Sequence, residues 1–123
     1  WHLGDSRAYG LSGRKVRGQL FAEAVRMTKD HVYGKNQLTK CVGSFGYERP
    51  DFKMGRLQNG QAVLLCSDGF RHCVMEEELA DVLLPERIND EKQITRRLRE
   101  IGNACMKRGE KDNLSTVYVK ALQ

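Results

Sequence analysis

Two aspartates stand where a carboxylate could hold a metal ion. Asp68 follows an apolar run at residues 62–66 and precedes Gly69. Asp112 lies in a polar turn just before an alternating stretch near the end of the chain. A carboxylate at the end of a core strand is held rigidly and partly removed from water. Hard divalent cations bind charged oxygen ligands fixed in this way, so the pair predicts a divalent-cation site.

Asp5 is a third candidate, because it lies in Gly4-Asp5-Ser6 within a strand-like run. The glycines beside Asp5 and Asp68 would let backbone or ligand approach closely. The alternative is an ordinary turn, since Asp-Gly and Asp-Asn are common turn pairs in which the aspartate caps local N–H groups. The residue pattern alone leaves both interpretations open.

Histidine and cysteine offer little for a zinc site. His72, four residues after Asp68, is a candidate ligand or acid, whereas His31 is expected to be a structural hydrogen-bonding residue. The cysteines form no C-x-x-C pair; they are Cys41, Cys66, Cys73 and Cys105. Cys66 and Cys105 lie in apolar settings and are predicted to be buried and unpaired. Free thiols indicate a reducing compartment, which favours the cytoplasm.

The elements that position these residues mix strands and helices. Strands are expected at 2–11 (interrupted at 4–6), 15–20, 52–57, 62–66 and 114–122, with turns at 12–13 and at the hairpin pair Asn59-Gly60. The run 62–66 is predicted to be buried on both faces. Residues 21–27 fit a helix or a strand, and 38–42 one helical turn.

Helices are expected at 75–84, stopped by Pro85, and after a cap at Asn89 or Asp90. Four apolar residues recur on one face of the second helix, which Gly109 ends; they are Ile94, Leu98, Ile101 and Cys105. Strands and helices do not alternate strictly, so the predicted class is α+β.

The length and charge of the chain narrow the classes of function that it can have. The 123 residues suit one domain. The net charge of +5 comes from scattered lysines and arginines, which favours a solvated surface over a nucleic-acid partner. No apolar run approaches the ~20 residues of a membrane span, and no signal peptide is visible. The chain begins with Trp1, so we expect it to be a piece of something longer.

Five segments, in order, resemble the C-terminal half of the PP2C (PPM) family of metal-dependent Ser/Thr protein phosphatases. They are HLGDSRAY, MTKDH, LTKCVG, LLCSDGF and EKDNLSTVYV, at residues 2–9, 27–31, 38–43, 64–70 and 110–119. The resemblance implies a β-sandwich flanked by helices in four layers, α-β-β-α, of which residues 1–123 form the C-terminal part.

The resemblance also assigns roles to single residues. Asp68 and Asp112 match metal ligands, and Asp5 matches a ligand of a third, weaker ion. Supporting or structural positions are matched by Ser67, Gly69, Asn113 and Arg7. His72 stands where many relatives have a fourth aspartate, so a third ion would lose that ligand or gain an imidazole.

The implied reaction is hydrolysis of phosphoserine or phosphothreonine in signalling phosphoproteins. Two Mg²⁺ or Mn²⁺ ions hold the attacking hydroxide, with no covalent enzyme intermediate. The family segments that supply a metal-bridging carboxylate and a phosphate-gripping arginine are not found here, and only residues 32–37 occupy the position of the family's flap. No catalytic residue beyond the metal ligands is therefore expected in this chain.

Three functions remain as alternatives. The chain is part of an active phosphatase, or of a non-catalytic pseudophosphatase or binding module with the same fold, or it is a basic nucleic-acid-binding domain. If the first half of the domain is missing, apolar sheet and strand edges become exposed. We then expect the chain to self-associate or to bind that half, and to be inactive alone.

Overall fold

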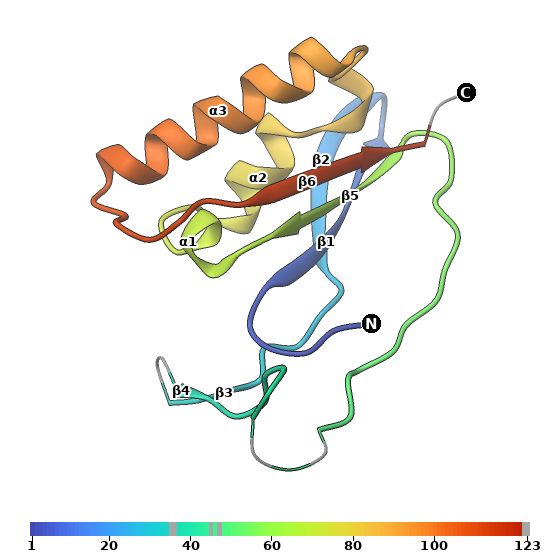
Figure 1. The fold of residues 1–123 in the computed structure, drawn as a ribbon. Helices are drawn as coiled ribbons and strands as arrows, with labels where there is room; N and C mark the ends of the chain where they lie inside the picture. Colours follow the sequence, from blue (N-terminus) through green and yellow to red (C-terminus); the bar gives the residue numbers. More distant parts are fainter. Residues whose placement is uncertain (35–36, 45, 47, 122–123) are drawn as a thin grey trace.

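The computed structural model describes residues 1–34, 37–44, 46 and 48–121. Four strands form an antiparallel sheet in the order β2-β1-β5-β6; they are β1 Arg7–Val16, β2 Gln19–Arg26, β5 Gln61–Cys66 and β6 Thr116–Lys120. All helices lie on one face of this sheet (Figure 1); they are α1 Asp68–Arg71, α2 Glu76–Val82, the 3₁₀ turn η1 Pro85–Arg87 and α3 Glu91–Lys107. A two-stranded ribbon, β3 Val32–Tyr33 and β4 Gln37–Leu38, lies apart from the sheet.

The core lies between the sheet and the helices. Alternate residues of β1 and β5 point toward the helices, as the two-residue period of a strand requires. The buried sheet residues are Tyr9, Leu11, Ala62, Leu64 and Cys66, and their buried helix-side partners include Phe70, Leu79, Leu83, Ile101 and Cys105. The predicted α+β class is therefore confirmed, with one layer of helices on the four-stranded sheet.

The opposite face of the sheet is apolar but uncovered in this chain. Val63 pairs with Val119, and Leu65 with Val117, across β5 and β6. Leu65, Val117 and Val119 keep 46%, 55% and 50% of their surface exposed. The prediction that 62–66 is buried on both faces is wrong, because the helices cover only one of them. Apolar residues fill both faces of this strand, which is typical of a strand that packs on two sides.

Residues 51–59 form an exposed arc that leads from the β3–β4 region to β5 (Figure 1). The predicted strand at 52–57 is wrong, because these residues pair with no other strand. The turn at Asn59-Gly60 does form, with the Gln61 N–H donating to the Gln58 carbonyl (3.0 Å), but no strand precedes it to make a hairpin.

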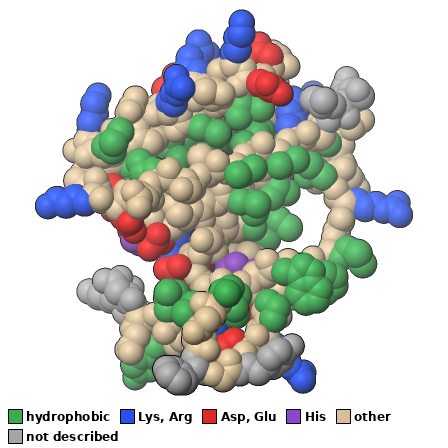
Figure 2. Space-filling model, in the orientation of Figure 1, with side chains coloured by type: hydrophobic (Ala, Val, Ile, Leu, Met, Phe, Trp, Pro, Cys, Tyr) green, Lys and Arg blue, Asp and Glu red, His purple; other side chains and the backbone are tan. Residues whose placement is uncertain are grey.

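A cavity of about 670 Å³ lies between this arc and the uncovered sheet face. Its lining includes Trp1, Lys53, Val63, Leu65, Ser67 and Val117. Figure 2 shows hydrophobic side chains around the opening that the arc encloses.

The first hairpin turns later than the sequence suggests. β1 continues through Ser12-Gly13, and the chain reverses at Arg17-Gly18, where both residues have positive φ (49° and 82°). Two such residues match the twist of a tight hairpin. Gly13 instead lies within β1, where its N–H donates to the Glu86 carboxylate (3.0 Å). Residues 21–27, which fit either a helix or a strand, lie largely in β2.

Helix α3 begins and ends at the residues that the sequence predicts. Asp90 accepts a hydrogen bond from the Gln93 N–H (2.7 Å), and Gln93 accepts one from the Asn89 N–H (3.0 Å), which makes a reciprocal cap. Gly109, at φ 97°, follows the end of α3 as predicted. The helical turn predicted at 38–42 is absent. None of the helices in the described ranges has the length and apolar character to cross a bilayer.

Candidate metal centre

Ser67 joins the turn that carries Asp68 to the turn that carries Asp112. Its N–H donates to the Ser115 carbonyl (2.9 Å), and its hydroxyl accepts from the Ser115 N–H (3.1 Å). The same hydroxyl donates to the Asn113 carbonyl (3.2 Å). The ends of β5 and β6 meet here because the two strands pair up to Cys66 and Thr116. The two aspartates therefore follow and precede neighbouring strands at one edge of the sheet.

Gly69 lets these turns approach more closely than any other residue would. A Cβ at this position would lie 2.7 Å from the Asn113 carbonyl oxygen and 3.1 Å from Asp112 Cβ. Such distances essentially exclude a side chain, since the closer contact is to backbone. The geometry brings the Asp68 and Asp112 segments into direct contact.

The carboxylates of Asp5, Asp68 and Asp112 form no ion pair among the described residues. One oxygen of Asp68 accepts the Gly69 N–H (2.9 Å), and one of Asp112 accepts the Asn113 N–H (2.7 Å). In both residues the second oxygen has no protein donor within the described ranges. Carboxylate oxygens of this kind are the ligands that Mg²⁺ and Mn²⁺ prefer.

Asp5 lies in the loop before β1, half-buried, with its backbone tied to α1. The Arg71 guanidinium donates to the Asp5 carbonyl (3.1 Å). The ligand atoms of Asp5, Asp68 and Asp112 do not all lie within 4.8 Å of one another. The structure thus brings Asp68 and Asp112 segments into contact and links Asp5 to them through Arg71.

Arg7 forms a two-pronged ion pair with Asp30 inside the fold. Its Nε donates to Oδ1 (2.9 Å) and its Nη2 to Oδ2 (2.7 Å), while Nη1 donates to the Tyr9 hydroxyl (3.0 Å). This hydrogen bonding holds the pKa of the Asp30 carboxyl below its usual value and raises the pKa of Arg7. Arg7 therefore anchors β1 to the segment before His31.

His72 is exposed and points to Glu110, with 3.1 Å between Nδ1 and Oε2. Sequence reasoning missed Glu110, whose other oxygen accepts the N–H groups of Lys111 and Asp112 (both 2.9 Å). These bonds, led by the one from Asp112, lower the pKa of Glu110. Glu110 thus shapes the Asp112 turn, and its place two residues before Asp112 was the one available signal.

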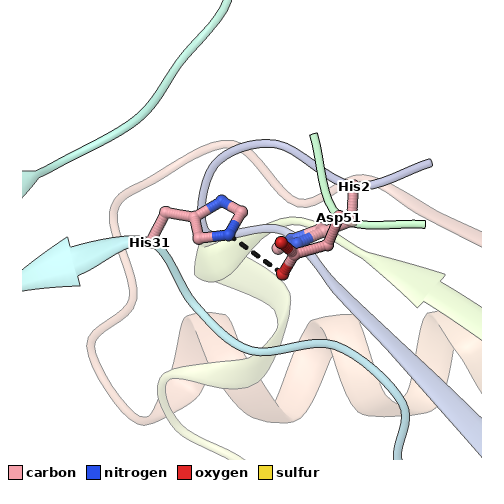
Figure 3. Close-up of side chains that lie close together, drawn as sticks. All are labelled: His2, His31 and Asp51. Atoms are coloured by element: carbon pink, nitrogen blue, oxygen red, sulfur yellow. Dashed lines mark hydrogen bonds and ion pairs between the residues drawn. The ribbon is translucent and has the colours of Figure 1, made fainter. Parts of the chain in front are cut away.

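A second cluster of potential ligand atoms joins His2, His31 and Asp51 (Figure 3). The Gly4 N–H donates to His31 Nδ1 (3.0 Å), so the proton of the neutral ring lies on Nε2, which faces Asp51 Oδ2 (3.1 Å). A metal at Nε2 would need that proton to move to Nδ1, against the Gly4 N–H. His31 therefore links the Gly4 backbone to the Asp51 side chain through hydrogen bonds, and the structural role predicted for His31 is confirmed.

No model of a protein family matches the sequence, and the search of curated proteins finds no match either. Solved structures do match. PppA, described as a key regulatory component of T6SS in Pseudomonas aeruginosa, is 27% identical with a TM-score of 0.74, over 98% of this chain and 50% of PppA. A serine/threonine phosphatase of S. agalactiae is 21% identical with a TM-score of 0.76, over 98% of this chain and 52% of the phosphatase.

The catalytic domain of the serine/threonine protein phosphatase PstP, solved with two manganese ions, is 25% identical with a TM-score of 0.67. The match covers 95% of this chain and 50% of that domain. This chain thus spans about half the length of each structure that it matches. The chain therefore has the fold of a PP2C-type serine/threonine phosphatase, over about half of such a domain.

Proposed function

We propose that this chain is the C-terminal, metal-binding part of a PPM-type phosphatase that hydrolyses phosphoserine and phosphothreonine in proteins. The observation that carries the proposal is the contact between the Asp68 and Asp112 turns, made through Ser67 and Gly69 on a PP2C fold. Two carboxylates on adjoining turns at a sheet edge, each with one oxygen that accepts no protein donor among the described residues, suit Mg²⁺ or Mn²⁺.

Each residue has a defined part in this proposal. Asp68 and Asp112 hold a divalent cation, and Asp5 contributes to a weaker one. Ser67 and Gly69 keep the two turns together, and Asn113 closes the Asp112 turn with its N–H. When bound, such ions make water a stronger nucleophile and neutralise charge on a phosphoryl group. His72, paired with Glu110, is assigned to shaping the Asp112 turn.

The uncovered sheet face supports a partner for this chain. Its apolar side chains and the cavity beneath the 51–59 arc suit a second layer of protein, and the matched phosphatases are about twice as long as this chain. The proposed occupant is the remaining half of a phosphatase domain, with self-association as the result in its absence. Because that half would supply further site residues, the chain alone should not turn over substrate.

Titration with Mn²⁺ tests the metal site directly. Asp68→Asn and Asp112→Asn should each weaken Mn²⁺ binding by roughly tenfold or more, since each removes a charged oxygen ligand. Asp81→Asn, at an exposed acid on α2, is the matched control and should leave binding unchanged. Unchanged affinity in both site variants would overturn the assignment.

Adding the N-terminal half of a phosphatase domain tests whether this chain takes part in phosphate hydrolysis. A complementary N-terminal half from a PP2C-type phosphatase, mixed with this chain, should give Mn²⁺-dependent release of phosphate from a phosphothreonine peptide. Tight assembly and Mn²⁺ binding without turnover would instead favour a non-catalytic binding module with the PP2C fold. Full turnover by the chain alone would contradict the proposed division of the site.

A further inference from the structure

Arg71 connects two segments that carry candidate ligands. It lies in α1, three residues after Asp68, and its side chain is only 12% exposed. Its Nη2 donates to the Asp5 carbonyl (3.1 Å) and lies 3.5 Å from Asp30 Oδ2. One guanidinium therefore contacts the loop before β1 and the segment before His31 from the same helical turn that begins with Asp68.

Charge pairing with Asp30 explains only part of this arrangement. Asp30 already takes the two-pronged pair from Arg7, so one carboxylate faces two guanidinium groups. Arg71 Nε is also buried with no hydrogen-bond partner among the described residues. A buried cation with an unpartnered N–H lowers stability. The hydrogen bond from Arg71 to the Asp5 carbonyl is the contact that remains to account for its position.

Other contacts of this loop lead away from α1. His31 N–H donates to the Gly4 carbonyl (2.8 Å), Gly4 N–H donates to His31 Nδ1, and His2 Nε2 faces the Ser6 carbonyl (2.7 Å). These bonds hold the loop to itself and to the segment around residue 31. Within the described residues, Arg71 makes the side-chain hydrogen bond that fixes Asp5 against α1.

We propose that Arg71 is a positioning residue for the candidate metal centre: it holds Asp5 in register with Asp68 through the Asp5 carbonyl. The inference rests on the metal site proposed above. Both contacts are made by Nη2 at the tip of the arginine side chain, and we expect the shorter lysine side chain to carry the charge without reaching both groups.

A double-mutant cycle on Mn²⁺ affinity tests the coupling. Asp5→Asn should weaken Mn²⁺ binding at the weaker site about tenfold in the wild-type chain, but less than about twofold when Arg71 is already replaced, because neighbours that act together are not additive. Arg71→Met and Arg71→Lys should behave alike. If the charge of Arg71 acted alone, Arg71→Met would strengthen binding and Arg71→Lys would leave it unchanged, which would overturn the proposal.

Arg97 provides the matched control. It also donates to one backbone carbonyl (Val82, 3.1 Å) and also has a buried, unpartnered Nε, but it lies on α3 and contacts the end of α2. In Arg97→Met the effect of Asp5→Asn should equal that in the wild type. Equal, additive effects of Asp5→Asn in the Arg71 and Arg97 backgrounds would overturn the inference.

Amide hydrogen exchange gives a readout without metal. The amide of Gly4, which donates to His31 Nδ1 in the same loop, should exchange roughly tenfold faster in Arg71→Met and be unchanged in Arg97→Met, because only the first variant loses the bond from α1 to this loop. Unchanged exchange in Arg71→Met would overturn the proposal. Asp68→Asn separates the two hypotheses: if it leaves Mn²⁺ affinity intact the proposed function fails, whereas additive Asp5 and Arg71 effects beside a large Asp68 effect overturn only this inference.

Discussion

Ser67 and Ser115 are joined by two hydrogen bonds that run in opposite directions, one from the Ser67 N–H to the Ser115 carbonyl and one from the Ser115 N–H to the Ser67 hydroxyl. Only Ser67 uses its side chain in this pair, and that side chain also reaches the Asn113 carbonyl. This one hydroxyl therefore adds two hydrogen bonds to the backbone bond between the Asp68 and Asp112 turns.

Removing this hydroxyl should loosen the candidate metal centre. Ser67→Ala leaves the Ser115 N–H and the Asn113 carbonyl without this partner, which should lower the free energy of unfolding by about 1–2 kcal/mol. Mn²⁺ affinity should fall about tenfold, as for other residues that orient ligands. Urea unfolding and Mn²⁺ titration measure the two effects. Ser115→Ala keeps every backbone bond and should change Mn²⁺ affinity by less than about twofold.

Gly69→Ala should be destabilising although alanine is the better helix former. Its Cβ would clash with the Asn113 carbonyl, so the turns must separate, at about 1–3 kcal/mol. Gly102→Ala is the control, because its Cβ meets only Leu114 at an ordinary 3.7 Å. That change should raise stability by about 0.5–1 kcal/mol through helix propensity. Thermal unfolding should give shifts of opposite sign, and shifts of equal sign would contradict the close approach at Gly69.

The Arg7–Asp30 pair should make stability depend on pH in the acid range. The folded state lowers the pKa of Asp30, so the pair stabilises the fold above the unfolded pKa of about 4. This contribution disappears as pH falls through the lower folded pKa. Asp30→Asn should cost roughly 3 kcal/mol at pH 7, because it leaves two arginines without their carboxylate. The difference from wild type in urea unfolding should shrink below about pH 4.

An exposed pair serves as the control for this prediction. Glu78 and Arg108 form a similar two-pronged bond at the surface, where solvent screens the charges. Glu78→Gln should change stability by less than about 1 kcal/mol at either pH. An Asp30→Asn variant as stable as Glu78→Gln would refute the buried role of Asp30.

The four cysteine thiols should divide into two that react slowly and two that react fast. Cys66 and Cys105 are free and buried, and burial raises the pKa of Cys66 to about 11. At pH 8 about one Cys66 thiol in a thousand is then ionised, and the thiolate is the reactive form. Cys41 and Cys73 are partly exposed and should label much faster with iodoacetamide. Equal rates for all four in the native chain would mean that the core opens readily.

The sequence could predict the parts of the site that are local. A carboxylate after an apolar run, followed by glycine, indicates a strand that ends at a polar turn, and Asp68 lies there. The α3 cap was predictable because Asp90 and Gln93 are three residues apart. Arg71 and Glu110 were not, because their roles depend on contacts with Asp5 and with the Asp112 turn that no local spacing encodes.

Errors in the predicted strands have a related cause. The segment 52–57 has strand-like composition, but a strand exists only when a partner strand supplies hydrogen bonds. Ser12-Gly13 suggests a turn, but Gly13 lies in a strand, where the Glu86 carboxylate and the Leu20 side chain occupy the space that a Cβ would need. Both errors arise because partners distant in sequence decide what a short pattern becomes.

The strand order has a consequence for how the chain folds. β1 and β2 are joined by the short Arg17-Gly18 turn, but β1 also pairs with β5, and residues 17–60 separate those two strands. β5 pairs in turn with β6 across a comparable stretch that contains all the helices. Each of these pairings requires closure of a long loop before its contacts form, which slows folding. We therefore expect one of these two long closures, rather than formation of the β1–β2 hairpin, to limit the refolding rate.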